Sequence, residues 1–308
     1  MAVTLADIAG EGTESSPYQI TTIDEFIEAA KQYNVYLKLM NDLDWNDYTG
    51  YMTPTVEIRA ADIDGNGHGI YNAYCYNTSY FNYTDADGPY TISQLTIHDL
   101  ILEIVQVGNA TLFVGHEVSS NCKKDYLFLN CDLRIKSYPI GTSLQGNALI
   151  YSSDAFSTRV WISFRECVIT IDVYGMSSGF SIFRNYDNTS SSFQFCEVKI
   201  NVINSNKQNF YCFRQFNIYN LAIFIDVDSA VDTTVITGSK LSNSYFVLRN
   251  TKSDEKPKLY IQNANISSTC FYNSDLSDIN GSFSNLYGLT TAQCKDPAYL
   301  TDLGFIVS

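Results

Sequence analysis

A short alternation of apolar and polar residues recurs through the middle of the chain. Its form is C-x-φ-x-I-x-φ, where φ is apolar, and it occurs in whole or in part at residues 131–135, 167–173 and 196–202. Residues 100–104 precede these segments and residues 221–227 follow them, with Leu in the place of Cys. Such alternation is typical of a strand that buries one face, because successive side chains point to opposite sides.

Two further short strands are predicted in each repeat. One is an apolar segment after a small or polar residue, as at 111–114 and 147–150, and the other leads directly into the Cys position, as at 126–129 and 160–164. A single unit of three short strands cannot bury its apolar face, so the units are expected to stack on one another.

Stacking predicts columns of equivalent residues along the molecule. One inward column is expected to hold Cys131, Cys167 and Cys196, and another holds the isoleucines of the same repeats: Ile135, Ile171, Ile200 and Ile225. The period of two then places the charged residues between them on the outer face: Arg134, Asp172, Lys199 and Asp226. An antiparallel sandwich, the alternative, would also alternate, but it would not repeat the same inward residue at one phase. The predicted fold is all-β, a single right-handed parallel β-helix.

An amphipathic helix is predicted before the repeats begin. Thr22 and Glu25 form a capping box. Apolar residues then recur with the helical spacing at Ile23, Phe26, Ile27 and Ala30. The helix is expected to cover about 22–33, with Asn34 in the left-handed conformation that ends it. Because the open end of a stacked coil exposes strand edges, this helix is interpreted as an N-terminal cap.

A second cap is predicted at the other end. Thr290 and Gln293 form another capping box, and Asp296 followed by Pro297 suits the start of a short helix that Gly304 would close. The expected organisation is a flexible segment over 1–17, a possible anchor, and one domain over 18–308. The rungs of that domain span about 35–288 and its C-terminal cap about 290–308.

The segment 62–68 is predicted to form a tight turn. Asp62, Asp64 and Asn66 have the order of a calcium loop, but the twelfth position is Ala73, which offers no side-chain oxygen, and no helix flanks the segment. No metal site is therefore predicted there.

Several segments resemble a known family. The opening "ITTIDEFIEAA…NVYLKLMNDLDWN", then "DIDGNGHGI", then the repeated rungs, and finally "LTTAQCKDPAYLTDLGF" are similar to pectate-lyase-like β-helix proteins of tailed-bacteriophage virions. Such proteins are tail fibres, tailspikes, head fibres or decorations. The resemblance implies a virion location after assembly in the host cytoplasm, other virion proteins as partners, and a homotrimer as an expected state.

Composition and charge narrow the expected partners. The net charge of −14 repels phosphate backbones, so nucleic acid is not an expected partner. No stretch approaches the roughly 20 apolar residues of a membrane span, so no membrane insertion is expected. The N-terminus lacks the features of a signal peptide.

Without an export signal, and without a C-x-x-C pair, the 8 cysteines are expected to be buried thiols instead of disulfides or zinc ligands.

No catalytic residue and no cofactor are predicted. Asp172 and Asp226 share a phase, but the rung of Asn201 separates them by about two strand spacings, near 10 Å, the outer limit for a hydrolytic pair. His98–Asp99 and His116–Glu117 are sequence neighbours, so on a strand their side chains would point to opposite faces. These residues, together with His68, are interpreted as ordinary surface groups.

The predicted binding surface is rich in tyrosine. Aromatic side chains supply rigid, amphipathic contact area that suits sugar faces or a partner subunit. The alternative is a polar loop that packs its rings on the solenoid. The candidate residues are Tyr71, Tyr74, Tyr76, Tyr80, Phe81, Tyr83 and Tyr90.

Three functions remain open on the sequence. The first is a non-enzymatic structural or host-attachment protein of a virion that binds another virion protein or a host surface polysaccharide. The second is a glycan-degrading tailspike, and the third is a host-encoded β-helix adhesin. The predicted lack of a catalytic group disfavours the second, and the predicted lack of an export signal disfavours the third.

Overall fold

The computed structural model describes most of the chain. The described residues are 3–47, 56–76, 81–83, 93–108, 113–115, 122–139, 148–155, 158–175, 181–185, 191–203, 210–228, 234–251, 254, 256–280 and 283–302.

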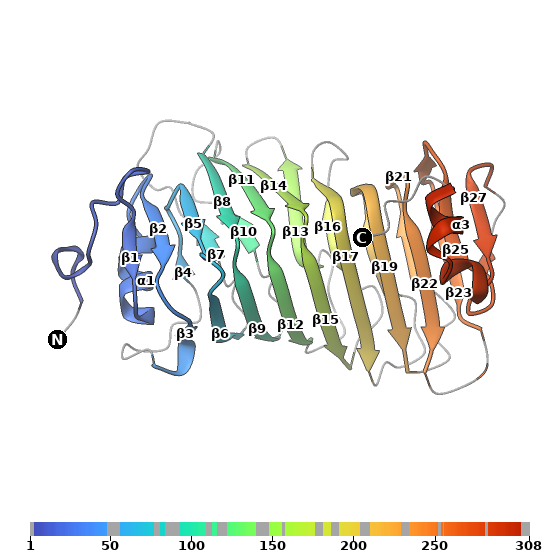
Figure 1. Ribbon diagram of the computed structural model, residues 1–308, viewed down its shortest axis with the longest axis horizontal. Helices are drawn as coiled ribbons and strands as arrows, with labels where there is room; N and C mark the ends of the chain where they lie inside the picture. The colour runs from blue at the N-terminus through green and yellow to red at the C-terminus, as the bar shows by residue number, and fades with distance from the viewer. Residues whose placement is uncertain are drawn as a thin grey trace.

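The strands line three faces of one coil along the molecule, which we call sheets I, II and III (Figure 1). On the third face the first three described strands pair only with one another. Sheet I contains β1 (Tyr18–Ile20), β2 (Tyr36–Leu39), β5 (Asp62–Asp64), β8 (Ser93–His98), β11 (Cys122–Leu129), β14 (Thr158–Arg165), β21 (Lys240–Ser242) and β24 (Asn265–Ile266). Sheet II contains β3 (Leu43–Asp44), β6 (Gly69–Tyr76), β9 (Ile101–Val107), β12 (Asp132–Tyr138), β15 (Val168–Tyr174), β22 (Tyr245–Asn250), β25 (Cys270–Asn273) and β27 (Leu286–Leu289). Two long strands, β17 (Ser192–Ile203) and β19 (Asn217–Val227), cross from sheet I into sheet II.

Sheet III completes each turn. It contains β4 (Val56–Glu57), β7 (Phe81–Tyr83), β10 (Phe113–Gly115), β13 (Ala148–Ala155), β16 (Ser181–Asn185), β18 (Phe210–Arg214), β20 (Thr234–Thr237), β23 (Lys258–Gln262) and β26 (Asp278–Asn280). The chain therefore passes from sheet III to sheet I to sheet II and begins the next rung, and strands of successive rungs pair in parallel. The predicted all-β parallel β-helix with three strands in a rung is confirmed. One antiparallel pair, β13 with β14, interrupts this rule inside a single rung.

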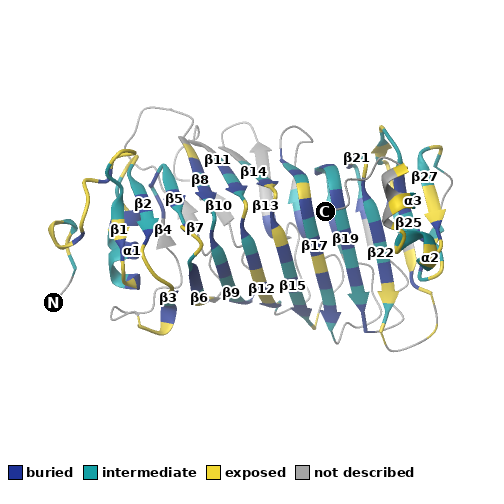
Figure 2. Ribbon diagram, in the orientation of Figure 1, coloured by how far each residue is buried: buried dark blue, intermediate teal, exposed yellow. Residues whose placement is uncertain are grey.

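The inward columns follow the predicted register. Ile135 lies opposite Ile104 and Ile171, Ile171 opposite Ile200, and Ile200 opposite Ile225. All five side chains are buried. Figure 2 shows the resulting alternation along β12, β15, β17 and β19, where buried positions are separated by more exposed ones.

Stacked phenylalanines fill the interior beneath sheets I and III. Phe164 lies with its ring centroid 5.1 Å from that of Phe128 and 4.9 Å from that of Phe193, in nearly parallel planes. Phe183 of sheet III meets Phe193 edge to face at 4.9 Å. Both arrangements are favoured for aromatic pairs. In-register stacking therefore places rings above one another in three successive rungs at Phe128, Phe164 and Phe193.

In the middle rungs the bend from sheet I to sheet II is made by a single residue. That residue has a positive φ, between 48° and 56°, in six successive rungs: Asp99, Asn130, Glu166, Phe195, Asn220 and Asn243. Asp and Asn adopt this left-handed conformation more readily than other residues with a side chain. We call these residues the corner column. Its two exceptions, Glu166 and Phe195, occupy a backbone conformation that their side chains disfavour.

Helices cover both ends of the coil, as predicted (Figure 1). Helix α1 (Ile23–Ala30) begins with the Thr22–Glu25 capping box and buries its apolar face. It ends at Ala30, earlier than the predicted Tyr33, although Asn34 does have the expected positive φ of 57°. At the other end, α2 (Thr291–Cys294) has the Thr290 capping box.

The last described helix is α3 (Pro297–Asp302). The Asp296 carboxylate accepts from the backbone N–H of Ala298 at 3.0 Å and of Tyr299 at 3.1 Å, the predicted N-cap role. The predicted stop at Gly304 lies outside the described residues. Among the described helices, none is long and apolar enough to cross a membrane.

Two N-terminal segments differ from the sequence-based expectation. The segment predicted to be a flexible lead-in contains a short helix, η1 (Leu5–Asp7), and packs on the first rung through Ile8, which is 5% exposed. The segment 62–68 begins as strand β5, and the turn itself covers only Gly65 to His68. Buried Ile63 between two outward aspartates explains the difference, since it continues an inward column. A second short helix, η2 (Trp45–Asp47), follows β3.

Candidate functional site

Three hollows follow one another along the outer surface of sheet II and its corner with sheet I. The first, about 590 Å³, lies over β5, β8 and the start of β12. The second, about 330 Å³, lies over β9, β12 and β15, and the third, about 270 Å³, reaches β22. Asp132 lines both the first and the second hollow, and Thr170 lines both the second and the third. We call this continuous line of hollows the outer row.

The outer row is lined by a ladder of polar and charged side chains. Register places Arg134 between Glu103 and Thr170, and Lys199 between Thr170 and Phe224. These side chains point outward because the period of two alternates them with the buried isoleucines. The ladder therefore presents one outward side chain at each rung, polar from Glu103 to Lys199 and apolar at Phe224, at the ~4.8 Å spacing of strands.

Charges of opposite sign are paired within the outer row. Arg134 binds Asp132 with its Nη2 atom 2.5 Å from a carboxylate oxygen, Lys199 pairs with Glu197, and Arg249 makes a two-pronged contact with Asp226. On the neighbouring rung the Asn201 amide donates to Asp172 at 2.7 Å. The local charges thus compensate one another although the whole chain is acidic.

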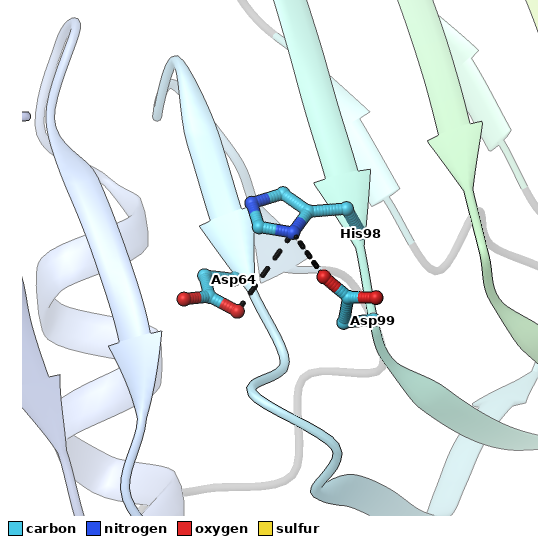
Figure 3. A group of neighbouring side chains, drawn as sticks. All are labelled: Asp64, His98 and Asp99. Atoms are coloured by element: carbon cyan, nitrogen blue, oxygen red, sulfur yellow. Dashed lines mark hydrogen bonds and ion pairs between the residues drawn. The ribbon is translucent and has the colours of Figure 1, made fainter.

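The imidazole of His98 lines the first hollow and lies between carboxylates (Figure 3). His98 Nδ1 lies 2.8 Å from an Asp99 oxygen and 3.8 Å from an Asp64 oxygen, and its Nε2 lies 3.2 Å from Asp62. The Asn130 amide donates to the other Asp99 oxygen at 2.5 Å. Lys38 completes the group with its Nζ 3.1 Å from Asp64. We call these residues the His98 cluster.

Register explains why these side chains meet. Lys38 of β2 lies opposite Asp64 of β5, which lies opposite His98 of β8, so three successive rungs contribute one residue each. Asp99 follows His98 but belongs to the corner column, and its φ of 52° turns its side chain back toward the imidazole. The expectation that His98 and Asp99 point to opposite faces is wrong, because the strand ends at His98.

The cluster shifts the pKa values of its own members. Burial acts to lower the pKa of His98, but the hydrogen bond with Asp99 and the charges of Asp62 and Asp64 outweigh it, so the pKa is raised. The hydrogen bonds from His98 and Asn130 lower the pKa of Asp99. Burial raises the pKa of Asp62, which the nearby imidazolium only partly offsets. The arrangement favours a charged His98 that donates from both ring nitrogens.

The same cluster has the donor types of a metal site. One atom each of Asp64, His98 and Asp99 lies within 4.8 Å of the others. A metal would require neutral imidazole, whereas these carboxylates favour the imidazolium, and Lys38 already pairs with Asp64. The donor set therefore fits an ion-pair cluster that joins neighbouring rungs better than it fits a metal.

The residues of the predicted tyrosine-rich surface are distributed over two sheets. Tyr71, Tyr74 and Tyr76 belong to β6 of sheet II, whereas Phe81 and Tyr83 belong to β7 of sheet III. Tyr80 and Tyr90 lie outside the described residues. The structure therefore does not gather these positions on one strand.

Part of the predicted surface adjoins the outer row. The hydroxyl of Tyr71 lies near enough to Arg134, Glu103 and Asp132 for their charges to act on its pKa, which burial above all raises. Tyr74 is 39% exposed. Tyr71 is thus positioned beside the second hollow, whereas the exposure of Tyr74 does not by itself place it there.

An aromatic pair that the sequence did not single out borders the outer row. Tyr138 at the end of β12 and Tyr174 at the end of β15 stack with ring centroids 4.6 Å apart and an angle of 7° between planes. Tyr138 is 37% exposed, so a ring edge or face remains available to a ligand. The sequence did contain a pattern that predicts this pair, because both tyrosines end their alternating segments at the same phase.

The carboxylates weighed from the sequence lie where register predicted. Asn201 stands between Asp172 and Asp226 on adjacent rungs. Asp172 accepts from Asn201 and Asp226 is held by Arg249, so each already has a partner. The His98 cluster was missed because 62–68 was interpreted wholly as a turn. Aligning Ile63 with Ile97 would have placed Asp64 beside His98.

Six of the cysteines are free thiols, as predicted. Five are buried and Cys294 is half-buried; the five are Cys131, Cys167, Cys196, Cys212 and Cys270.

Comparisons with known proteins show no family for this chain. No protein-family model matches the sequence, and no curated protein matches it. A solved structure that matches is the "putative immunoglobulin A1 protease" from Bacteroides ovatus, 13% identical over 96% of this chain and 90% of that chain, with a TM-score of 0.41. A likeness at that level carries no argument about function, which must come from the geometry of this chain.

Proposed function

We propose that this protein is a non-enzymatic attachment protein whose outer row binds an extended surface polysaccharide. The observation that supports the proposal is the continuity of the three hollows, which share Asp132 and Thr170. A linear polymer laid along the solenoid axis would meet outward side chains at the strand spacing, mostly polar in the first two hollows and mixed with Phe224 and Val247 in the third.

The lining chemistry suits a neutral glycan. Paired charges such as Arg134 with Asp132, and Arg249 with Asp226, offer both donors and acceptors to sugar hydroxyls without a net local charge. The overall charge of −14 disfavours a polyanion. The stacked Tyr138 and Tyr174 add an aromatic edge of the kind that packs on sugar rings.

The assignment of this protein to a bacteriophage virion rests on the sequence resemblance alone. The opening and closing segments that resemble phage β-helix proteins fold here as the two end caps, which is consistent with that assignment. On this basis the protein is a fibre or decoration of a virion, in contact with other virion proteins and assembled as a homotrimer. Sedimentation of the purified chain as a monomer would contradict the trimer.

Binding is tested with purified polysaccharides and their oligosaccharide fragments, measured by isothermal titration calorimetry. Affinity is expected to rise with chain length until the ligand spans the outer row. Arg134→Ala and Tyr138→Ala are expected to weaken binding about tenfold each, because each removes a direct contact worth roughly 1.4 kcal/mol. Lys240→Ala, an exposed residue of sheet I outside the outer row, is the control and should bind normally. Equal affinity for monosaccharide and polymer would contradict the proposal.

A second candidate is glycan hydrolysis at the first hollow. One oxygen of Asp64 and one of Asp99 lie within 4.8 Å, close to the roughly 5–5.5 Å between carboxyl groups in retaining glycosidases. His98 and Lys38 hold these oxygens in ion pairs, which is why we rank this candidate second. Incubation with each bound polysaccharide distinguishes the two: new reducing ends that Asp64→Asn abolishes would establish hydrolysis and overturn the non-enzymatic assignment.

A further inference from the structure

Three thiols occupy equivalent positions in consecutive rungs. The inward column that begins sheet II reads Leu100, Cys131, Cys167, Cys196 and Leu221 from rung to rung. The backbone N–H of Val168 bonds to the carbonyl of Cys131, and that of Glu197 to the carbonyl of Cys167, each at 2.9 Å. The three cysteines are 3%, 1% and 5% exposed. They form a dry column of sulfur with a leucine at each end.

The sulfur atoms share one orientation. Cys131 Sγ donates to the Leu129 carbonyl at 3.4 Å and to the Ile97 carbonyl of the rung before at 3.3 Å. Cys167 Sγ donates to the equivalent carbonyls, of Arg165 at 3.2 Å and of Phe128 at 3.4 Å. Because the contacts repeat, adjacent sulfur atoms are separated by about the strand spacing, ~4.8 Å.

That spacing matches a two-coordinate metal. Metal–thiolate bonds of about 2.3 Å place the two sulfurs of a linear S–metal–S unit ~4.6 Å apart. Thiolates select soft ions, of which Cu(I) is an example, over the hard cations that oxygen ligands prefer. An ion midway between adjacent rungs would therefore bind both sulfurs with little movement of the backbone.

We propose that Cys131, Cys167 and Cys196 form a site for one soft metal ion, bound linearly between Cys167 and either neighbour. With Hg(II), two S–H bonds break, two S–Hg bonds form and two protons leave to solvent. The product is electrically neutral, so no uncompensated charge is buried.

The test uses Hg(II) added to the full-length reduced protein without oxygen. The background variant carries Cys75→Ser, Cys122→Ser and Cys294→Ser, which leaves the three column thiols with Cys212 and Cys270. Native mass spectrometry measures stoichiometry, and ¹⁹⁹Hg NMR distinguishes linear two-coordinate mercury from other geometries. One linear ion for each chain is expected.

The variants give a pattern that only this column predicts. Cys131→Val and Cys196→Val each leave one adjacent pair, so both should still bind one linear ion. Cys167→Val leaves two thiols separated by two spacings, ~9.6 Å, and linear binding should be lost. Cys212→Val, which removes a fully buried thiol outside the column, is the matched control and should behave as the background.

Circular dichroism and thermal unfolding check that each variant is folded. If Cys167→Val does not fold, Cys167→Ala and Cys167→Ser replace it, and the folded background protein should still gain thermal stability on binding Hg(II). Linear mercury in Cys167→Val, its loss in Cys131→Val, or no binding by the folded background protein would overturn the proposal.

Discussion

The inward columns and the corner column are both ladders with one residue per rung, but they select residues by different physical criteria. The inward column that reads Leu, Cys, Cys, Cys, Leu holds only buried side chains that pack as hydrophobes, whatever their size. The corner column reads Asp, Asn, Glu, Phe, Asn, Asn, with unrelated volumes and one shared backbone conformation. The residue type at a repeated position can therefore be selected by packing in the core or by the backbone angle φ. Substitutions at the two kinds of position distinguish these criteria.

The largest effect is expected from Phe193→Ala. Phe193 is fully buried and meets the rings of Phe164 and Phe183, each at 4.9 Å. Removing it leaves a cavity and should lower the free energy of unfolding by about 3–5 kcal/mol, measured by urea denaturation. Phe195→Ala, two residues along the same strand at a corner that is 49% exposed, is the control. A comparable loss in both variants would contradict the distinction between columns.

Asn220→Ala tests the conformational criterion directly. Asn220 has a φ of 50°, and alanine lacks the polar side chain that makes this region tolerable. The expected loss of stability is about 1 kcal/mol, again from denaturation midpoints. Asn220→Gly should recover most of it because glycine adopts positive φ without strain. If both substitutions cost the same, side-chain contacts and not φ would govern the corner.

Phe195→Asn should stabilise the protein. The substitution places the residue type of the neighbouring rungs at a φ of 54° and removes a half-exposed aromatic ring. We expect a gain of roughly 0.5–1 kcal/mol, visible as a higher Tm. Destabilisation would instead show that the Phe195 ring makes contacts that outweigh the backbone strain, as expected of a residue kept for binding.

The smallest predicted effect is a pH dependence of folding stability that arises from His98 and Asp99, the first residue of the corner column. The folded-state pKa of His98 is raised, so its contribution to stability is full below the unfolded pKa of about 6.5 and is lost as pH rises through the folded value. Asp99 has a lowered pKa, so its contribution disappears as pH falls below about 4.

The measurement compares Tm at about pH 5.5 and about pH 8 for the native protein and for His98→Gln. On going from the lower to the higher pH, the Tm of the native protein should fall by more than the Tm of the variant. Identical pH profiles would show that His98 is not charged in the folded protein.

Much of the fold follows from local patterns. The recurrence of Ile135, Ile171 and Ile200 at one phase predicts parallel stacking, because only a coil returns the same residue to the same face. The capping boxes at Thr22 and Thr290 predict the end helices, since an N-cap needs only residues within one turn. Two boundaries were predicted wrongly: α1 ends at Ala30, and Asp62 begins a strand where a turn was expected.

The candidate site depends on register between rungs, which no local pattern records. Lys38, Asp64 and His98 are far apart in sequence, and they meet because β2, β5 and β8 pair in parallel at one register. The left-handed turn at Asp99 then brings its carboxylate back to His98.

The sequence by itself thus determined the class of fold, the inward columns and the two caps, because these depend on periodicities and capping motifs a few residues long. Only the tertiary structure decided which side chains meet in the His98 cluster and which hollows join into the outer row. Each of these depends on how loops of variable length set one rung upon the next, and the cost of closing such loops changes too slowly with length to fix register.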